Sequence, residues 1–135
     1  MEDKTEITRH FKFPKKERLH SKKLIDALFS EGASFHLYPF TLKYLSNPSP
    51  EADCHQVMVS VSKKKYKRAV DRNRIKRIIK EAYRLQKHEK LSESINGSYL
   101  LISYIYMAKE IHSYDFIEKK LIESLRRLSD KLQKG

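Results

Sequence analysis

The segment from Asp71 to about Glu89 predicts a long helix with one apolar face and one strongly basic face. Residues of the apolar face recur every three or four positions, as in a core-facing stripe: Ile75, Ile78, Ile79, Ala82 and Leu85. Residues of the basic face recur at every fourth position and form a solvent-facing ridge: Arg72, Lys76, Lys80 and Arg84. One side of this helix must pack on a core while the other stays in water, which requires a layered fold.

The remaining hydrophobic patterns predict helices and strands around this segment. A first helix runs from about Ser21 to Ser30, with Ser21 as its N-cap and Gly32 just beyond its end. Strand patterns occupy residues 37–45, where apolar side chains alternate, residues 57–61, and residues 99–107, which are almost wholly apolar. A last helix follows Ser113. The order of these elements predicts an α+β fold in which helices pack on a sheet.

The length of 135 residues suits a single domain. Residues 1–10 are mostly polar, so we expect a flexible N-terminal tail followed by one domain over residues 11–135. Between these limits the chain contains no internal repeat and no segment with the composition of a domain linker.

The charge is concentrated in one part of the chain. The whole sequence has 29 Lys and Arg against 17 Asp and Glu, a formal charge of +12. The segment from Lys63 to Lys90 alone has thirteen basic and three acidic residues, which leaves a net charge of +10. A solvated helix face explains part of this excess, but the basic run from Lys63 to Arg68 directly before the helix favours a surface that binds a polyanion.

Several classes of function are disfavoured by what the sequence lacks. No apolar run approaches the roughly 18 residues of a membrane-spanning helix. Binding to a membrane surface would require an exposed apolar helix face, but the apolar stripe of the Asp71–Glu89 helix is required for the core. A DNA-binding helix-turn-helix would require a short helix and turn before Asp71. The six histidines lack metal-ligand spacing, and Cys54 is the only cysteine. We therefore expect a cytoplasmic RNA-binding protein with no catalytic residue, no metal site, and neither DNA nor a membrane as a partner.

Two motifs resemble a known family. The run Val61-Ser-Lys-Lys64 is followed by Ala69-Val-Asp-Arg-Asn-Arg-Ile-Lys-Arg-Ile-Ile-Lys-Glu-Ala-Tyr-Arg84, and this order is similar to that of the bacterial ribonuclease P protein family. The triplet Arg72-Asn73-Arg74 matches the family's RNR motif. The stretches Phe13–Leu19 and Leu28–Gly32 resemble the family's entry to, and exit from, its first helix. The resemblance covers roughly residues 11–130.

The resemblance implies a fold and an activity. The fold is a two-layer α/β sandwich with a mixed sheet, like a ribosomal-protein domain, and with a left-handed βαβ crossover that general rules of handedness would not suggest. The activity is endonucleolytic removal of the 5′ leader from precursor tRNA, which yields the mature 5′ end. The RNA subunit and its magnesium ions are the catalyst, and the protein's partners are that RNA and precursor tRNA. The alternative is a structural RNA-binding protein, such as a ribosomal protein.

The resemblance also implies roles for individual residues. The residues expected to face the catalytic RNA are Arg72, Asn73, Arg74, Lys76, Arg77, Lys80 and Arg84. A cleft between the first helix and the sheet would hold the leader, and the residues expected to line it or lie close by are Phe29, Phe40, Lys43, Ser60, Ser62, Lys63 and Lys64. Further RNA contacts are expected from Lys15, Arg18, Lys65, Lys67 and Arg68.

The chain departs from the usual family pattern at three places near the expected leader cleft. Ile25 and Lys43 stand where aromatic residues are frequent, and the loop at Lys65–Arg68 lacks the usual glycine. We therefore expect a leader cleft that depends more on charge and less on stacking.

Overall fold

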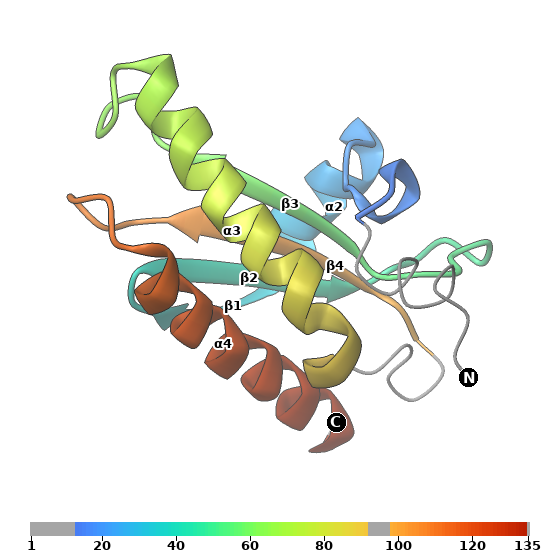
Figure 1. The fold of residues 1–135 in the computed structure, drawn as a ribbon. Helices are drawn as coiled ribbons and strands as arrows, with labels where there is room; N and C mark the ends of the chain where they lie inside the picture. The colour runs from blue at the N-terminus through green and yellow to red at the C-terminus, as the bar shows by residue number, and fades with distance from the viewer. Residues whose placement is uncertain (1–12, 92–97, 135) are drawn as a thin grey trace.

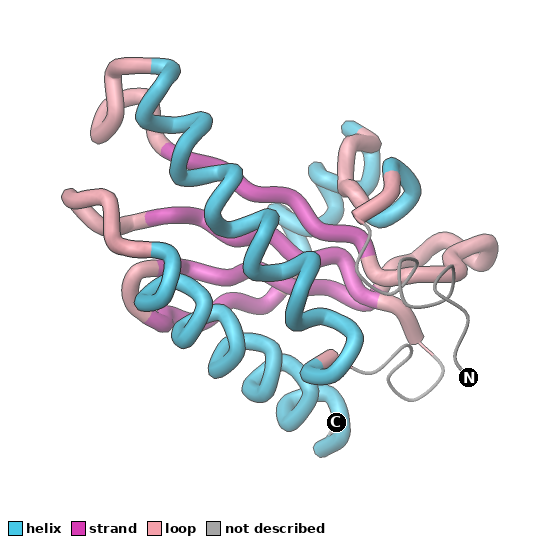
Figure 2. The backbone as a smooth tube through the Cα atoms, viewed as in Figure 1, coloured by secondary structure: helices cyan, strands magenta, loops and turns pink. Residues whose placement is uncertain are grey.

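The computed structural model describes residues 13–91 and 98–134. The predicted flexible tail lies outside the described residues, as does Asn96-Gly97, a pair that predicts a turn. The elements in chain order are η1 (Lys15–Glu17), α2 (Lys22–Glu31), β1 (Ala33–Leu37), β2 (Phe40–Ser46), β3 (Gln56–Val61), α3 (Ala69–Lys90), β4 (Leu100–Tyr106) and α4 (Tyr114–Lys134). Figures 1 and 2 show them as one sheet with helices packed against it.

The four strands form a mixed sheet in the order β1-β2-β4-β3. Strand β2 is antiparallel to both β1 and β4, whereas β3 is parallel to β4. Helix α3 connects the two parallel strands across one face of the sheet. Figure 1 shows this crossover to be left-handed, an arrangement found in about 2% of such connections. The fold class expected from the sequence is therefore confirmed.

Helices cover the two faces of the sheet unequally. Helices α3 and α4 lie side by side on one face, and α2 lies on the other (Figure 1). The main core lies under α3 and α4, where β2 and β4 contribute alternate residues to it. Its fully buried side chains include Phe40, Leu42, Ile75, Ile79, Tyr83, Ile102, Tyr104, Leu121 and Leu125. Helix α2 buries a smaller cluster of Leu19, Leu28 and Leu101 on the opposite face.

Most of the predicted helical details are confirmed. Ser21 caps α2, and its Oγ accepts a hydrogen bond from the backbone N–H of Leu24 at 3.4 Å. On α3, three residues of the predicted apolar stripe are buried in the core, Ile75, Ile79 and Ala82, whereas Ile78 packs against it and Ile78 and Leu85 are only partly buried. Tyr83, which lies among basic residues and was not included in the stripe, is also buried there.

The strand predicted over residues 37–45 is confirmed as β2 (Phe40–Ser46), although it begins later than predicted, and the strand before it, β1 (Ala33–Leu37), was not predicted. The two strands are antiparallel and are joined by a tight turn at Tyr38-Pro39. Pro39 has no backbone N–H to donate to a neighbouring strand, so it interrupts the pairing even though the apolar alternation continues through it. Tyr38 is exposed in the turn, whereas Phe40 and Leu42 are buried.

Gly32 ends α2 at a point where two parts of the backbone come together. Its φ of −70° is accessible to any residue, so conformational freedom does not explain the glycine. A Cβ at this position would lie 2.3 Å from the carbonyl oxygen of Leu28 and 3.0 Å from that of Tyr44. The absence of a side chain therefore lets the end of α2 approach β2.

We predict that Gly32→Ala lowers the free energy of unfolding by about 1–3 kcal/mol, because the new methyl group must displace backbone atoms. Urea denaturation measures this change. Ser34→Ala, an exposed site on β1, is the matched control and should change stability by less than about 0.5 kcal/mol. Equal stability of Gly32→Ala and the wild type would contradict the proposed close approach.

Candidate nucleic-acid interface

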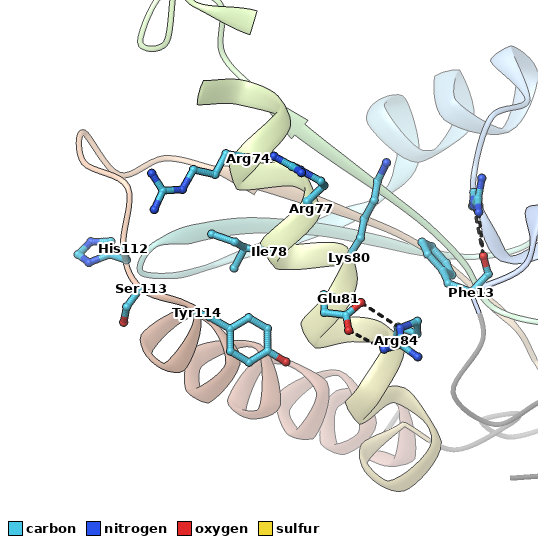
Figure 3. Close-up of a pocket in the computed structure, with 11 residues that line it drawn as sticks. Phe13, Arg74, Arg77, Ile78, Lys80, Glu81, Arg84, His112, Ser113 and Tyr114 are labelled. Atoms are coloured by element: carbon cyan, nitrogen blue, oxygen red, sulfur yellow. Dashed lines mark hydrogen bonds and ion pairs between the residues drawn. The ribbon is translucent and has the colours of Figure 1, made fainter. Parts of the chain in front are cut away.

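Helix α3 presents a group of basic side chains that the protein itself does not neutralise. Arg74, Arg77 and Lys80 are exposed, Lys76 is half-buried, and none of them forms a hydrogen bond or ion pair with another described residue. Figure 3 shows Arg74, Arg77 and Lys80 extending from α3 in different directions. Like charges at this spacing repel one another by a few tenths of a kcal/mol per pair, and phosphate groups would convert that repulsion into attraction.

A hollow of about 750 Å³ extends over the outer surface of α3. Phe13 lies on one side of the helix, and His112 and Tyr114 lie on the other (Figure 3). Five basic residues but only one acidic residue line this hollow: Arg18, Arg74, Arg77, Lys80 and Arg84, with Glu81. A concave surface with walls of one charge strengthens the local field and raises the concentration of an oppositely charged ligand. We call these lining residues the α3 surface.

Two members of the predicted ridge have partners within the protein. The Arg84 guanidinium donates to both carboxylate oxygens of Glu81, with Nε–Oε2 at 3.0 Å and Nη2–Oε1 at 2.5 Å. This hydrogen bonding holds the pKa of the Glu81 carboxyl below its usual value. Arg72 points to the preceding loop, so Lys76 and Lys80 are the ridge members that lack a partner among the described residues.

Arg72 holds the basic loop that comes before α3. Its Nη1 donates to the carbonyl oxygens of Tyr66 at 2.7 Å and of Lys67 at 2.9 Å. Direct contact of Arg72 with RNA stays a prediction, and in the structure its Nη1 is bonded to this loop. Arg72 therefore acts in this conformation as a positioning residue for its neighbours.

The loop over residues 62–68 is fixed at three further points. The Oγ of Ser62 accepts from the backbone N–H groups of Lys64 and Lys65, at 3.1 and 3.4 Å. The hydroxyl of the buried Tyr66 donates to the carbonyl of Ala108 at 2.7 Å. The Nζ of Lys65 donates to the carbonyl of Met107 at 2.6 Å. These contacts leave four basic side chains exposed on a defined backbone: Lys63, Lys64, Lys67 and Arg68.

The N-terminal segment is attached to the edge of the α3 surface. Phe13 packs edge-on against Tyr83 with ring centroids 5.4 Å apart, and Lys87 pairs with Glu17 while its Nζ lies 5.7 Å from the Phe13 ring. Arg18 donates to the carbonyl of Phe13 and lines the hollow. Of the two contacts predicted here, Arg18 therefore joins the α3 surface, whereas the exposed Lys15 does not line it. Sequence reasoning did not find the role of Phe13.

The residues expected to bind a leader lie mainly on the opposite face of the sheet. The strand registers place Lys43 beside Ser103, and Ser60 beside Ile105, on the face that α2 partly covers. The Nζ of Lys43 lies 5.2 Å from the centroid of the Phe29 ring and donates to the Phe29 carbonyl at 3.4 Å. Phe29 is 40% exposed and so offers an accessible ring beside a cation.

Two further observations define this sheet surface. Ser103 is fully buried on the same face, and its Oγ has no hydrogen-bond partner among the described residues. Ser62, Lys63 and Lys64 are exposed where β3 ends. We call Phe29, Lys43, Ser60, Ser62, Lys63 and Lys64 the sheet surface.

Phe40 does not belong to the sheet surface. It is 1% exposed and packs edge-on against Tyr104 and Tyr106 in the core beneath α3 and α4. Successive residues of a strand point to opposite faces, so Phe40 and Lys43, three positions apart, cannot lie on the same face. The expected contact of Phe40 with a leader is therefore wrong for this structure.

Comparison with known proteins assigns the family. The family model described as Ribonuclease P matches residues 13–132. The chain belongs to the ribonuclease P protein family. Two curated relatives named ribonuclease P protein component support this. One, from Porphyromonas gingivalis, is 35% identical over 122 residues, which are 88% of each chain. The other, from Chlorobium phaeobacteroides, is 32% identical over 79% of this chain and 81% of its own.

Solved ribonuclease P proteins share this fold. The protein from Thermotoga maritima has a TM-score of 0.67 at 24% identity and covers 82% of this chain and 96% of its own. The protein from Staphylococcus aureus has a TM-score of 0.64 at 22% identity and covers 86% of this chain and 97% of its own. The mixed sheet and the arrangement of its helices are therefore those of a ribonuclease P protein.

The described residues contain no group of three His, Cys, Asp or Glu that could hold a metal ion. Cys54, beside Asp53 and His55, is half-buried, and burial is the main cause that raises the pKa of its thiol to about 11. A thiol with a raised pKa is a poor nucleophile at neutral pH. Among the described helices, none is long and apolar enough to span a membrane.

We predict that Arg72→Lys loosens the 62–68 loop although it keeps the positive charge, because an ammonium group cannot reproduce the guanidinium geometry. The backbone N–H of Tyr66, which donates to the Ser62 carbonyl at 3.0 Å, should exchange with solvent measurably faster. Hydrogen exchange detects this change. Arg77→Lys is the matched control and should leave the exchange rate of that amide unchanged. An equally protected Tyr66 amide in both variants would show that Arg72 does not hold the loop.

Proposed function

We propose that this ribonuclease P subunit works in the cytoplasm, where it binds the catalytic RNA through the α3 surface and the 5′ leader of precursor tRNA through the sheet surface. In this way it promotes endonucleolytic removal of the leader. The observation that carries the proposal is the presence of basic side chains on α3 that have no partner among the described residues, in a chain of this family. The two surfaces lie on opposite faces of one sheet, so both RNAs can be bound at once.

The chemistry of the α3 surface suits a folded RNA. Arg74 and Arg77 offer planar groups that bind phosphate with two hydrogen bonds, and Lys80 adds a point charge. Lys76, on the same helix but outside the hollow, adds another. Asn73 is exposed beside them and can donate to, or accept from, a base or a phosphate. Helix α3 packs over its length on the sheet and α4, so these groups are held on a rigid support and lose little freedom on binding.

The chemistry of the sheet surface suits a single strand. Unpaired bases bind to exposed aromatic rings while cations follow the backbone, and Phe29 and Lys43 provide one of each within 5.2 Å. Ser60 and Ser62 can bind either phosphates or base edges. With one exposed ring and three lysines, this surface depends more on charge than on stacking.

We assign the chemical step to the RNA subunit. The described residues provide neither a metal site nor an activated nucleophile, and the thiol of Cys54 is shifted toward its unreactive form. We therefore infer that magnesium acts while held mainly by the RNA. A purely structural RNA-binding role would explain the α3 surface, but it would leave the sheet surface without a ligand.

Reconstitution with the catalytic RNA of ribonuclease P tests the function. The protein should bind precursor tRNA more tightly than mature tRNA and should restore cleavage at low magnesium concentration. Binding assays and cleavage rates measure the two effects. Equal affinity for both tRNA forms, together with no gain in cleavage, would contradict the proposal and favour a structural role.

Separate variants test the two surfaces. We predict that Phe29→Ala weakens binding of precursor tRNA by about 5- to 150-fold, the equivalent of one lost stacked base, without changing affinity for the catalytic RNA. Arg77→Ala should weaken binding to the catalytic RNA and reduce its salt dependence by about one unit of slope. Filter binding across a salt series measures both. If each variant affected both RNAs equally, the two-surface arrangement would be wrong.

A further inference from the structure

Two exposed apolar residues lie on neighbouring stretches of backbone at one end of the sheet, outside both surfaces described above. Tyr38 is 55% exposed and Met107 is 45% exposed, whereas most large apolar residues of the described chain are buried. The backbone N–H of Met107 donates to the carbonyl of Pro39, the residue after Tyr38, at 2.8 Å. Exposure of large apolar side chains to water is unfavourable, and groups of such side chains commonly mark binding sites.

The ring of Tyr38 is held in a fixed orientation. Its Oη is 2.8 Å from Nε2 of His112, and its ring packs edge-on against His112 and Phe116 with centroids 5.4 and 6.3 Å away. His112 is itself stacked on Phe116 at 4.4 Å. We call Tyr38, His112 and Phe116 the aromatic cluster. A ring that is both exposed and already ordered loses little conformational entropy when a flat ligand stacks on it.

The aromatic cluster is continuous with the α3 surface. His112 belongs to both, because it also lines the hollow that contains Arg74 and Arg77. An RNA whose phosphates lie on these arginines therefore passes within reach of Tyr38.

The charges around the cluster indicate which part of a nucleotide it would bind. Two cations lie near the cluster: the Nζ of Lys120 is 5.7 Å from the centroid of the Phe116 ring, and the Nζ of Lys65 donates to the Met107 carbonyl. Acidic groups are present as well. Glu110 lies 3.7 Å from His112, and Asp115 is exposed at the start of α4. These mixed charges do not favour a phosphate at the cluster itself. They are compatible with an uncharged, planar base, which stacks on any exposed ring.

We propose that Tyr38, ordered by His112 and Phe116, is a stacking site for an unpaired base of the RNA that occupies the α3 surface. This inference rests on the proposed function, since it assumes that RNA binds there. The phosphates contact Arg74 and Arg77, while a base that extends beyond the end of α3 stacks on Tyr38. The site adds affinity that does not depend on salt, because stacking releases no counterions.

Three variants test the site by filter binding to the catalytic RNA over a salt series. Tyr38→Ala should weaken binding by about 5- to 150-fold without changing the salt slope. Tyr38→Phe keeps the ring and loses only the bond to His112, so it should bind nearly as the wild type does. Arg77→Ala is the reference and should lower both the affinity and the slope.

The outcomes separate this inference from the proposed function. Wild-type binding by Tyr38→Ala alongside weak binding by Arg77→Ala would overturn the stacking site alone. Wild-type binding by both variants would overturn the RNA interface on α3 together with the stacking site. An equal loss in Tyr38→Ala and Tyr38→Phe would show that the hydroxyl, and not the ring, accounts for the effect, and would also overturn the stacking site.

Fluorescence provides a direct readout because the protein contains no tryptophan. Tyr38→Trp places a single indole at the site, and the catalytic RNA should quench its emission. Heparin, a polyanion without bases, should leave the emission unchanged, and Lys119→Trp, at an exposed position on α4, should respond to neither. Equal quenching by heparin, or a change in emission with protein concentration in the absence of RNA, would overturn base stacking. The second result would favour self-association through the cluster.

Discussion

The burial of the apolar stripe of α3 against the sheet determines the rest of the arrangement. Ile75, Ile79 and Tyr83 are almost completely buried, so the helix cannot rotate about its axis without exposing them. Because the rotation is fixed, the directions of Arg74, Arg77 and Lys80 are also fixed. The core therefore decides which charges face outward. A substitution in this stripe would move the basic residues as a group, although none of them belongs to the core.

Within this arrangement the basic residues fall into two kinds. Arg72, Arg84 and Lys87 are bonded to other parts of the protein, to loop carbonyls, to Glu81 and to Glu17. These bonds order the loop before α3 and attach the N-terminal segment to the helix. The basic residues without partners retain their full electrostatic capacity for a ligand. The net charge of the sequence therefore overestimates the charge that is available for binding. It also does not show that the charged groups are attached to an ordered backbone.

Much of the fold and part of the site could be predicted from the sequence. The helices followed from a period of 3.6 residues and from the caps, and the RNA-binding character followed from the charge on one helix. The β1–β2 turn was missed because the apolar alternation continues through Pro39. The position of Phe40 was missed because periodicity shows that two faces exist but not which helix covers each one. The internal role of Arg72 depends on a loop conformation that no local pattern encodes, and the left-handed crossover was implied only by family resemblance.

The alternation of side chains across β2 and β4 has an evolutionary consequence. Successive residues in these strands lie on different faces of the sheet: Tyr104 lies in the core, whereas Ser103 lies beside Lys43 of the sheet surface. Insertion or deletion of a single residue within a strand would move every side chain beyond that point to the opposite face, so that core residues would face outward and surface residues would face the core. Length variation among homologues should therefore be confined to the connections between strands, such as residues 47–55. The strands themselves should diverge by substitution alone.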